Sequence, residues 1–171
     1  MKSFLLLAIS VTTMFVARGQ DDKSKRPSPP AQAKETISNG AVVTIDYSQP
    51  SVKGRTIGKD LEPMPGKVWR TGANEATTFD VSKPVKVEGK ELPAGKFALF
   101  TIANDNEWTI IFNKTANQWG AFSYKEADDV LRVKVKPQKA GKFAEKMTFS
   151  VNKNGTVTLL WGDTKVDFKV S

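Results

Sequence analysis

The sequence predicts a single-domain, all-β protein: an antiparallel β-sandwich of about nine strands, with a β-barrel as the alternative. Short segments in which apolar and polar residues alternate recur along the chain, separated by residues typical of turns. No segment carries an apolar repeat of helical period over a useful length. Strict alternation indicates strands with one buried and one solvated face, as in antiparallel sheets. The length of 171 residues fits one domain.

Residues 1–19 have the pattern of a secretory signal peptide. Lys2 precedes an apolar run from Phe4 to Val16, which is too short to span a bilayer core of about 30 Å. The small residues Ala17 and Gly19 predict cleavage ahead of Gln20. No cysteine follows the run, which excludes a lipid-anchored lipoprotein. We therefore expect export to the periplasm or the extracellular space, with no membrane-spanning segment left after cleavage.

Residues 20–34 are charged and then proline-rich, which predicts an extended tether ahead of a β domain over residues 35–171. The end of the tether, residues 26–31, also suits an edge of the domain, because proline is tolerated at sheet edges.

The composition excludes several kinds of chemistry. The chain has no cysteine and no histidine, so it lacks a thiol nucleophile, an imidazole base and the usual zinc, copper or haem ligands. We expect no metal and no cofactor. The formal charge of +8 falls to +6 when the two basic residues of the signal peptide are removed. An exported protein without an aromatic–basic recognition motif is not expected to bind nucleic acid.

The first half of the domain contains a strand, a long irregular loop and a central hairpin. Ala41–Tyr47 alternates as a strand, whereas residues 48–67 are rich in proline and glycine and predict an irregular loop of a length that is often functional. Lys96–Ile102 and Trp108–Asn113 are apolar on both faces, which predicts two central strands joined by a turn at Asn104–Asn106. Two short strands are expected between the loop and this hairpin, at residues 77–81 and 85–87.

The second half begins with a polar and aromatic segment, residues 114–129, in which Lys125–Asp129 suits one helical turn. Four alternating segments follow and predict strands, with turns at Asn154-Gly155 and Gly162-Asp163. These strands are expected at residues 131–135, 147–151, 157–161 and 166–170.

The richest hydrogen-bonding and stacking chemistry lies in residues 66–79. Trp69 suits a stacking platform, Arg70 an anion-binding fork, Asn74 a donor and acceptor, and Glu75 a base or acceptor. We therefore place a candidate ligand site where the loop of residues 48–67 meets residues 69–75. Further contributors to this site are expected to be Tyr47, Lys53, Arg55 and Trp119.

The same residues also fit a purely structural corner, and the sequence leaves both interpretations open. In the structural interpretation Arg70 pairs with Glu75 or Asp46, and Trp69 fills the core. A related question concerns Trp119, which belongs to an aromatic and amide-rich set with Asn113, Gln118, Phe122 and Tyr124 that could line a sugar-binding groove. Trp108, at the start of a predicted strand, is expected in the core.

We expect a ligand-binding or structural module rather than an enzyme, and no catalytic residue can be assigned. The partner would be an unknown small molecule or an envelope glycan, bound by a monomer or weak dimer. One alternative is a carboxylate-dependent glycan hydrolase that uses Asp46 and Glu75, whose separation would set the stereochemistry. A second alternative is a protein-interaction module that uses a sheet edge.

Several motifs together resemble the bacterial family called domain of unknown function 2911, over about residues 27–171. The most specific is the run from Val68 to Thr77, Val-Trp-Arg-Thr-Gly-Ala-Asn-Glu-Ala-Thr. The resemblance implies an exported β protein that carries a signal peptide, and it implies no reaction and no catalytic residue. Small departures occur at Met64-Pro65, Phe97 and Phe122. The supporting motifs are residues 26–29, 47–55, 92–95, 99–102, 108–113 and 118–121.

Overall fold

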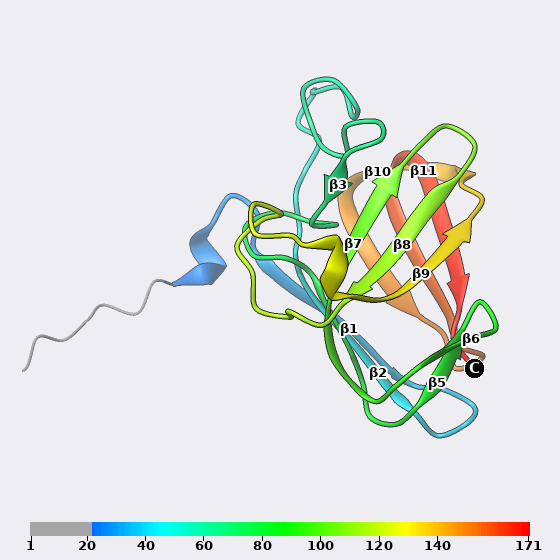
Figure 1. Cartoon of the computed structure of the whole chain (residues 1–171). Coiled ribbons are helices and arrows are strands. Elements are labelled where there is room, and N and C mark those ends of the chain that lie inside the picture. Colours follow the sequence, from blue (N-terminus) through cyan, green and yellow to red (C-terminus); the bar gives the residue numbers. More distant parts are fainter. Residues whose placement is uncertain (1–21) are drawn as a thin grey trace, which may run out of the picture.

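The computed structural model describes residues 22–171, so the predicted signal peptide and its cleavage point lie outside the described residues (Figure 1). Within this range the chain forms eleven strands and two single-turn 3-10 helices, η1 (Lys23–Lys25) and η2 (Glu126–Asp128). No sheet closes on itself. The predicted all-β sandwich is therefore confirmed in place of the barrel. No helix in residues 22–171 combines the length and hydropathy needed to cross a membrane.

The larger of the two layers is a seven-stranded antiparallel sheet. Its strands follow the order β1-β2-β4-β7-β8-β9, and the short strand β3 pairs with β7 beyond the end of β4. β1 begins at Pro30, inside the range 20–34 that was assigned to the tether, and forms one edge of the sheet. The strands of this layer are β1 (Pro30–Thr36), β2 (Val42–Ser48), β3 (Val68–Trp69), β4 (Thr78–Val81), β7 (Gly95–Ala103), β8 (Trp108–Asn113) and β9 (Asp129–Val135).

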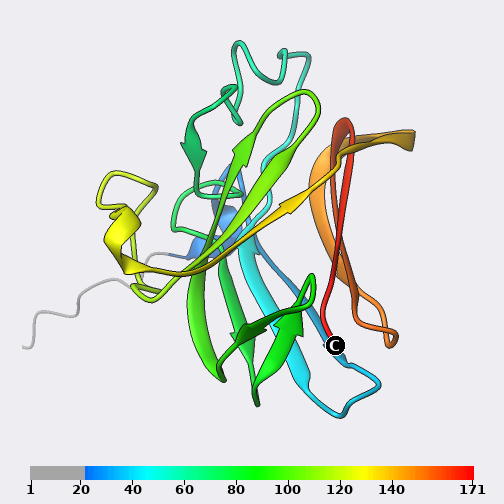
Figure 2. The ribbon, with the colours of Figure 1, turned by 45° about the vertical axis from the view of Figure 1, so that its right-hand side comes forward.

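The second layer is a long hairpin of β10 (Gln138–Val151) and β11 (Thr156–Lys169), which Figure 2 shows beside the larger sheet. The predicted turn at Asn154-Gly155 joins these strands. The predicted turn at Gly162-Asp163 is wrong, because β11 continues through it and Gly162 pairs with Ala144 at a register shift. The register shifts place the extra residues on β10, opposite Gly162, and the positive φ of +59° at Gly162 lies within β11 without ending it. A small hairpin, β5 (Val85–Val87) and β6 (Lys90–Leu92), meets the C-terminus.

The main core lies between the two layers. Phe79 on β4 packs with its ring centroid 5.0 Å from Phe112 on β8 and 6.3 Å from Phe168 on β11. Trp161 on β11 is also buried, and its indole N–H donates to the carbonyl of Glu62 at 2.8 Å. Each such side chain contributes about 1.5–3 kcal/mol when it is fully buried. The hairpin and the irregular loop are thereby fixed against the sheet.

The central strands β7 and β8 are apolar on both faces, as predicted, and the outer face therefore needs its own cover. Phe100 and Ile111 are fully buried in a second, smaller cluster on this face. Tyr124 packs on Phe100 at 5.0 Å between ring centroids. Figure 2 shows the segment that carries η2 on the side of the sheet opposite the hairpin. Residues 114–128 thus lie across the outer face, and this places the candidate site.

The β10–β11 turn provides a test of this packing. We expect Gly155→Ala to destabilise the protein by about 2–3 kcal/mol, because φ is +83° and the new methyl group would collide with the backbone carbonyl of Val170. Gly89→Ala is the matched control: φ is +77°, but the methyl group would meet no atom within 4 Å, so we expect a loss of about 1 kcal/mol. Urea unfolding of both variants measures the difference. Equal losses would contradict the close approach of the two backbones.

Candidate functional site

Two segments that are distant in sequence meet on the outer face of the larger sheet. Backbone hydrogen bonds of 2.9 and 3.1 Å join residues 74–76 to residues 118–120, and Glu75 pairs with Trp119 in an antiparallel bridge. Residues directly opposite each other in such a bridge carry their side chains on the same side. Glu75 and Trp119 therefore project together from this point.

The first described residues, 22–29, lie over this pair, and we call them the strap. Arg26 Nη1 donates to both carboxylate oxygens of Glu75 at 3.1 Å. The Arg26 guanidinium also lies 6.0 Å from the ring centroid of Trp119, within the range of a cation–π contact. Lys23 Nζ lies 2.9 Å from Glu75 Oε1. Glu75 is thus held by two cations from the strap.

Two further hydrogen bonds attach the strap to the domain. Asn74 Nδ2 donates to the carbonyl of Ser28 at 3.0 Å, and the backbone N–H of Gln49 donates to the carbonyl of Pro29 at 2.8 Å. Asn74 has φ +57°, a left-handed conformation that asparagine adopts more readily than most residues. Asn74 was predicted as a donor and acceptor for a ligand. In the structure its amide N–H group holds the strap instead.

Partial burial acts to raise the pKa of Glu75, but hydrogen bonds from Lys23, from its own backbone and from Arg26 outweigh this effect. The pKa of Glu75 falls to about 2. The carboxylate is therefore ionised throughout the neutral range.

Two buried polar atoms beside this bridge have no hydrogen-bond partner among the described residues. They are Thr78 Oγ1, on β4, and Gln118 Oε1, in the segment of residues 114–128 that covers the outer face and that we call the covering segment. Each of these residues is only 8% exposed. Leaving such an atom unpaired costs about 1–3 kcal/mol. Such atoms are rare in native proteins and call for a specific explanation.

The surface between the strap and Trp119 is hollowed into two adjoining parts of about 180 and 200 Å³, which share Glu75, Ala76 and Thr78. We call the two parts together the outer groove. The first part is also lined by Lys23, Arg26, Pro30, Asp46, Tyr47, Ser48 and Lys96, and the second by Ala116, Asn117, Gln118 and Trp119.

The charged groups of the outer groove are paired with one another. Besides the ion pairs of Glu75 with the strap, Asp46 accepts a hydrogen bond from Lys96 at 3.3 Å and one from Gln32 at 2.7 Å. Trp119 is 57% exposed and leaves much of its ring open to solvent. The groove therefore combines an aromatic face, charges engaged in ion pairs and two unsatisfied neutral polar atoms.

Arg70 does not form either of the ion pairs considered from the sequence. It follows β3 and is half-buried, and its Nε has no hydrogen-bond partner within residues 22–171. Desolvation lowers the pKa of Arg70, while the charge of Glu62 acts in the opposite direction. The pairing with Glu75 or Asp46 that the structural interpretation required does not form, because Lys23, Arg26 and Lys96 take those carboxylates.

Comparison of the chain with known proteins finds one match, to a family model. A family model described as "Protein of unknown function (DUF2911)" matches residues 28–170. The chain belongs to the DUF2911 family. The resemblance drawn from the Val68–Thr77 run is thereby confirmed. Neither the curated proteins nor the solved structures contain a significant match.

Two of the predicted site residues serve the core of this DUF2911 protein. Trp69 is buried, packs against Trp108 at 6.4 Å between ring centroids, and donates its indole N–H to the carbonyl of Gly72 at 3.1 Å. Tyr47 borders the outer groove, but its ring packs on Phe149 at 5.2 Å and its hydroxyl accepts the backbone N–H of Phe149. Neither ring offers a stacking platform.

Lys53 and Arg55 lie in the irregular loop and do not line the outer groove. The Lys53 backbone N–H donates to Glu145, and the Arg55 guanidinium donates to the carbonyls of Ser51 and Val52 in its own loop. Arg55 lines a separate hollow of about 380 Å³ against β11. The loop and residues 69–75 therefore do not form one common site with these two cations.

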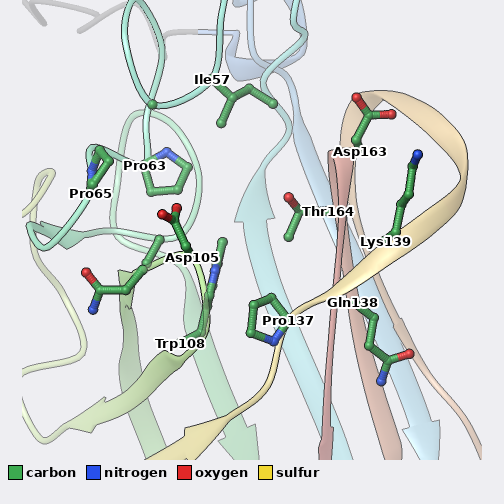
Figure 3. Close-up of a pocket in the computed structure, with 13 residues that line it drawn as sticks. Ile57, Pro63, Pro65, Asp105, Trp108, Pro137, Gln138, Lys139, Asp163 and Thr164 are labelled. Carbon is green, nitrogen blue, oxygen red and sulfur yellow. The ribbon is translucent and has the colours of Figure 1, made fainter.

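The loop does border a larger hollow of about 490 Å³ at the open end of the sandwich (Figure 3). Pro63 and Pro65 lie on one side of it and Lys139 and Asp163 on the other. Its charged residues are exposed, and it contains none of the buried unsatisfied atoms. Within residues 22–171 no three Asp, Glu, His or Cys side chains gather in a way that could hold a metal. The outer groove is therefore the stronger candidate.

Sequence reasoning missed the strap cations and Thr78. Lys23 and Arg26 lie in a segment that reads as a tether, and Arg26 is 49 residues from Glu75. Thr78 follows the alternation of β4, in which Phe79 and Val81 face the core, so its outward direction was predictable. The burial of Thr78 was not predictable from the sequence, because the strap and the covering segment create it.

We expect Glu75→Gln to lower stability by at most about 1 kcal/mol at pH 7, since this ion pair is partly exposed. The folded-state pKa is depressed, so the wild-type contribution is present above the ordinary value of 4.5 and is lost as pH falls towards 2. Melting temperatures recorded from pH 7 to pH 2 should therefore converge for wild type and variant below pH 4.5. A constant difference across that window would contradict the ion-pair assignment.

Proposed function

We propose that this DUF2911 protein is a ligand-binding module of the bacterial envelope, and that the outer groove is its binding site. The observation that carries the proposal is the presence of two buried, unsatisfied polar atoms beside an exposed tryptophan. A site built for a ligand leaves groups unpaired until the ligand supplies their partners, whereas a structural corner satisfies its own groups.

The signal-like pattern of the first residues supports the envelope setting. The pattern of residues 1–19 suits a cleaved secretory signal, and a chain without cysteine forms no disulfides after export. Intact mass measurement of the exported protein tests this part, with Gln20 as the expected first residue. A chain that retains residues 1–19 would contradict it.

The glycan hydrolase alternative is disfavoured by the state of its two carboxylates. Asp46 and Glu75 both line the first part of the groove, but each is engaged by cations. A glycosidase needs one carboxyl group whose pKa is raised, so that it can donate a proton at neutral pH. The pKa of Glu75 is instead lowered to about 2. Binding without cleavage therefore fits the groove better.

Trp119→Ala tests the groove as the binding site. The mature protein is incubated with a low-molecular-mass extract of the cell envelope and with purified envelope polysaccharide, and bound species are measured by native mass spectrometry and tryptophan fluorescence. We expect the variant to lose at least about tenfold in affinity, about 1.4 kcal/mol, because the aromatic face is removed.

Phe122→Ala is the matched control for this measurement. Phe122 is 85% exposed on the same segment but does not line the groove, so its removal should leave binding unchanged. Absence of any bound species on the wild type, or equal losses in both variants, would overturn the proposal.

A further inference from the structure

The hydrogen-bonding state of Gln118 indicates what a ligand must supply. Its Nε2 donates to the carbonyl of Thr115 at 2.7 Å and to Asn113 Oδ1 at 3.3 Å. Both neighbours are acceptors, which fixes the amide with its nitrogen towards them. Gln118 Oε1 is the atom that remains unpaired, and a carbonyl oxygen can only accept. A ligand must therefore present an O–H or N–H group to this position.

Thr78 Oγ1 is the second unsatisfied atom, and Thr78 is one of the residues that line both parts of the groove. A hydroxyl can both donate and accept, so it pairs well with another hydroxyl. One ligand carrying several hydroxyl groups can therefore satisfy both atoms.

The ion pairs of the groove argue against a charged ligand. Glu75 is paired with both Lys23 and Arg26, and Asp46 lies 3.3 Å from Lys96. A charged ligand would have to compete with a member of one of these ion pairs for its partner, and desolvating the ligand would be costly. Among the residues that line the groove, the atoms still lacking partners belong to neutral groups, because Arg70, whose Nε is also unpaired, does not line it.

Trp119 adds the last requirement. Its exposed ring is a flat apolar surface at the wall of the second part of the groove. A ligand that suits it carries an apolar ring face together with hydroxyl groups at its edge. Sugar rings combine these two features in one small unit.

We infer that the outer groove binds a neutral saccharide, with hydroxyl groups on Thr78 Oγ1 and Gln118 Oε1 and a ring face on Trp119. This inference rests on the proposed function, because it names the ligand class of the same site. It predicts that the Thr78 hydroxyl lowers the stability of the ligand-free protein and strengthens binding of the ligand.

Thr78→Val tests this trade-off, since valine keeps the shape and removes the unpaired oxygen. We expect the melting temperature of the ligand-free protein to rise by about 2–4 °C, because a buried unsatisfied group is removed. Thr77→Val is the matched control on the neighbouring residue: its buried hydroxyl already donates to the carbonyl of Thr71 at 2.7 Å, so its melting temperature should fall. If Thr78→Val falls as well, the hydroxyl is satisfied within the protein and the inference is overturned.

Binding is measured by calorimetry with matched sugars: N-acetylglucosamine against glucosamine, and glucose and its neutral disaccharides against glucuronate. We expect neutral members to bind the wild type and Thr78→Val to lose at least about tenfold in affinity. Preference for a charged member, or for a non-sugar species from the envelope extract, would overturn the saccharide inference while the binding module stands. No binding of any sugar or extract component would overturn both.

Discussion

The arrangement of this protein depends on the need to cover both faces of the central strands β7 and β8. Phe100 and Ile111 on the outer face are as deeply buried as the main core, and residues 114–128 provide the cover. This segment is held by the backbone bridge between residues 74–76 and 118–120. The bridge places Glu75 beside Trp119, and Gln118 donates to Asn113 at the end of β8. The candidate site is thus a consequence of how the second apolar face is covered.

The strap completes this arrangement through charge. Lys23 and Arg26 pair with Glu75 and line the groove, while Asn74 fixes the strap through the carbonyl of Ser28. The ion pairs are partly exposed and contribute little to stability by themselves. Their larger effect is chemical, because they occupy both carboxylates of the groove. What remains unpaired is a buried hydroxyl and a buried amide carbonyl, beside an exposed aromatic face.

The sequence predicted the architecture better than the site, for physical reasons. Lys96–Ile102 and Trp108–Asn113 are apolar at successive positions, which marks central strands, and Asn154-Gly155 marks a tight hairpin. These are local patterns. The partner of Glu75 was not predictable, because Arg26 is distant in sequence and lies in a segment without apolar periodicity. Gly162 was misjudged because β11 continues through its positive φ, opposite extra residues that β10 inserts into the ladder. The family resemblance was confirmed but supplied no mechanism.

The central claim is that Thr78 Oγ1 and Gln118 Oε1 are left unpaired for a ligand. Crystal structures of the mature protein with and without a neutral disaccharide test it most directly, at a resolution that places individual waters. The account predicts that hydroxyl oxygens of the sugar lie about 2.6–3.2 Å from both atoms and that a ring face rests on Trp119. A sugar bound elsewhere, or waters that pair with both atoms and stay in place when the sugar is present, would contradict it.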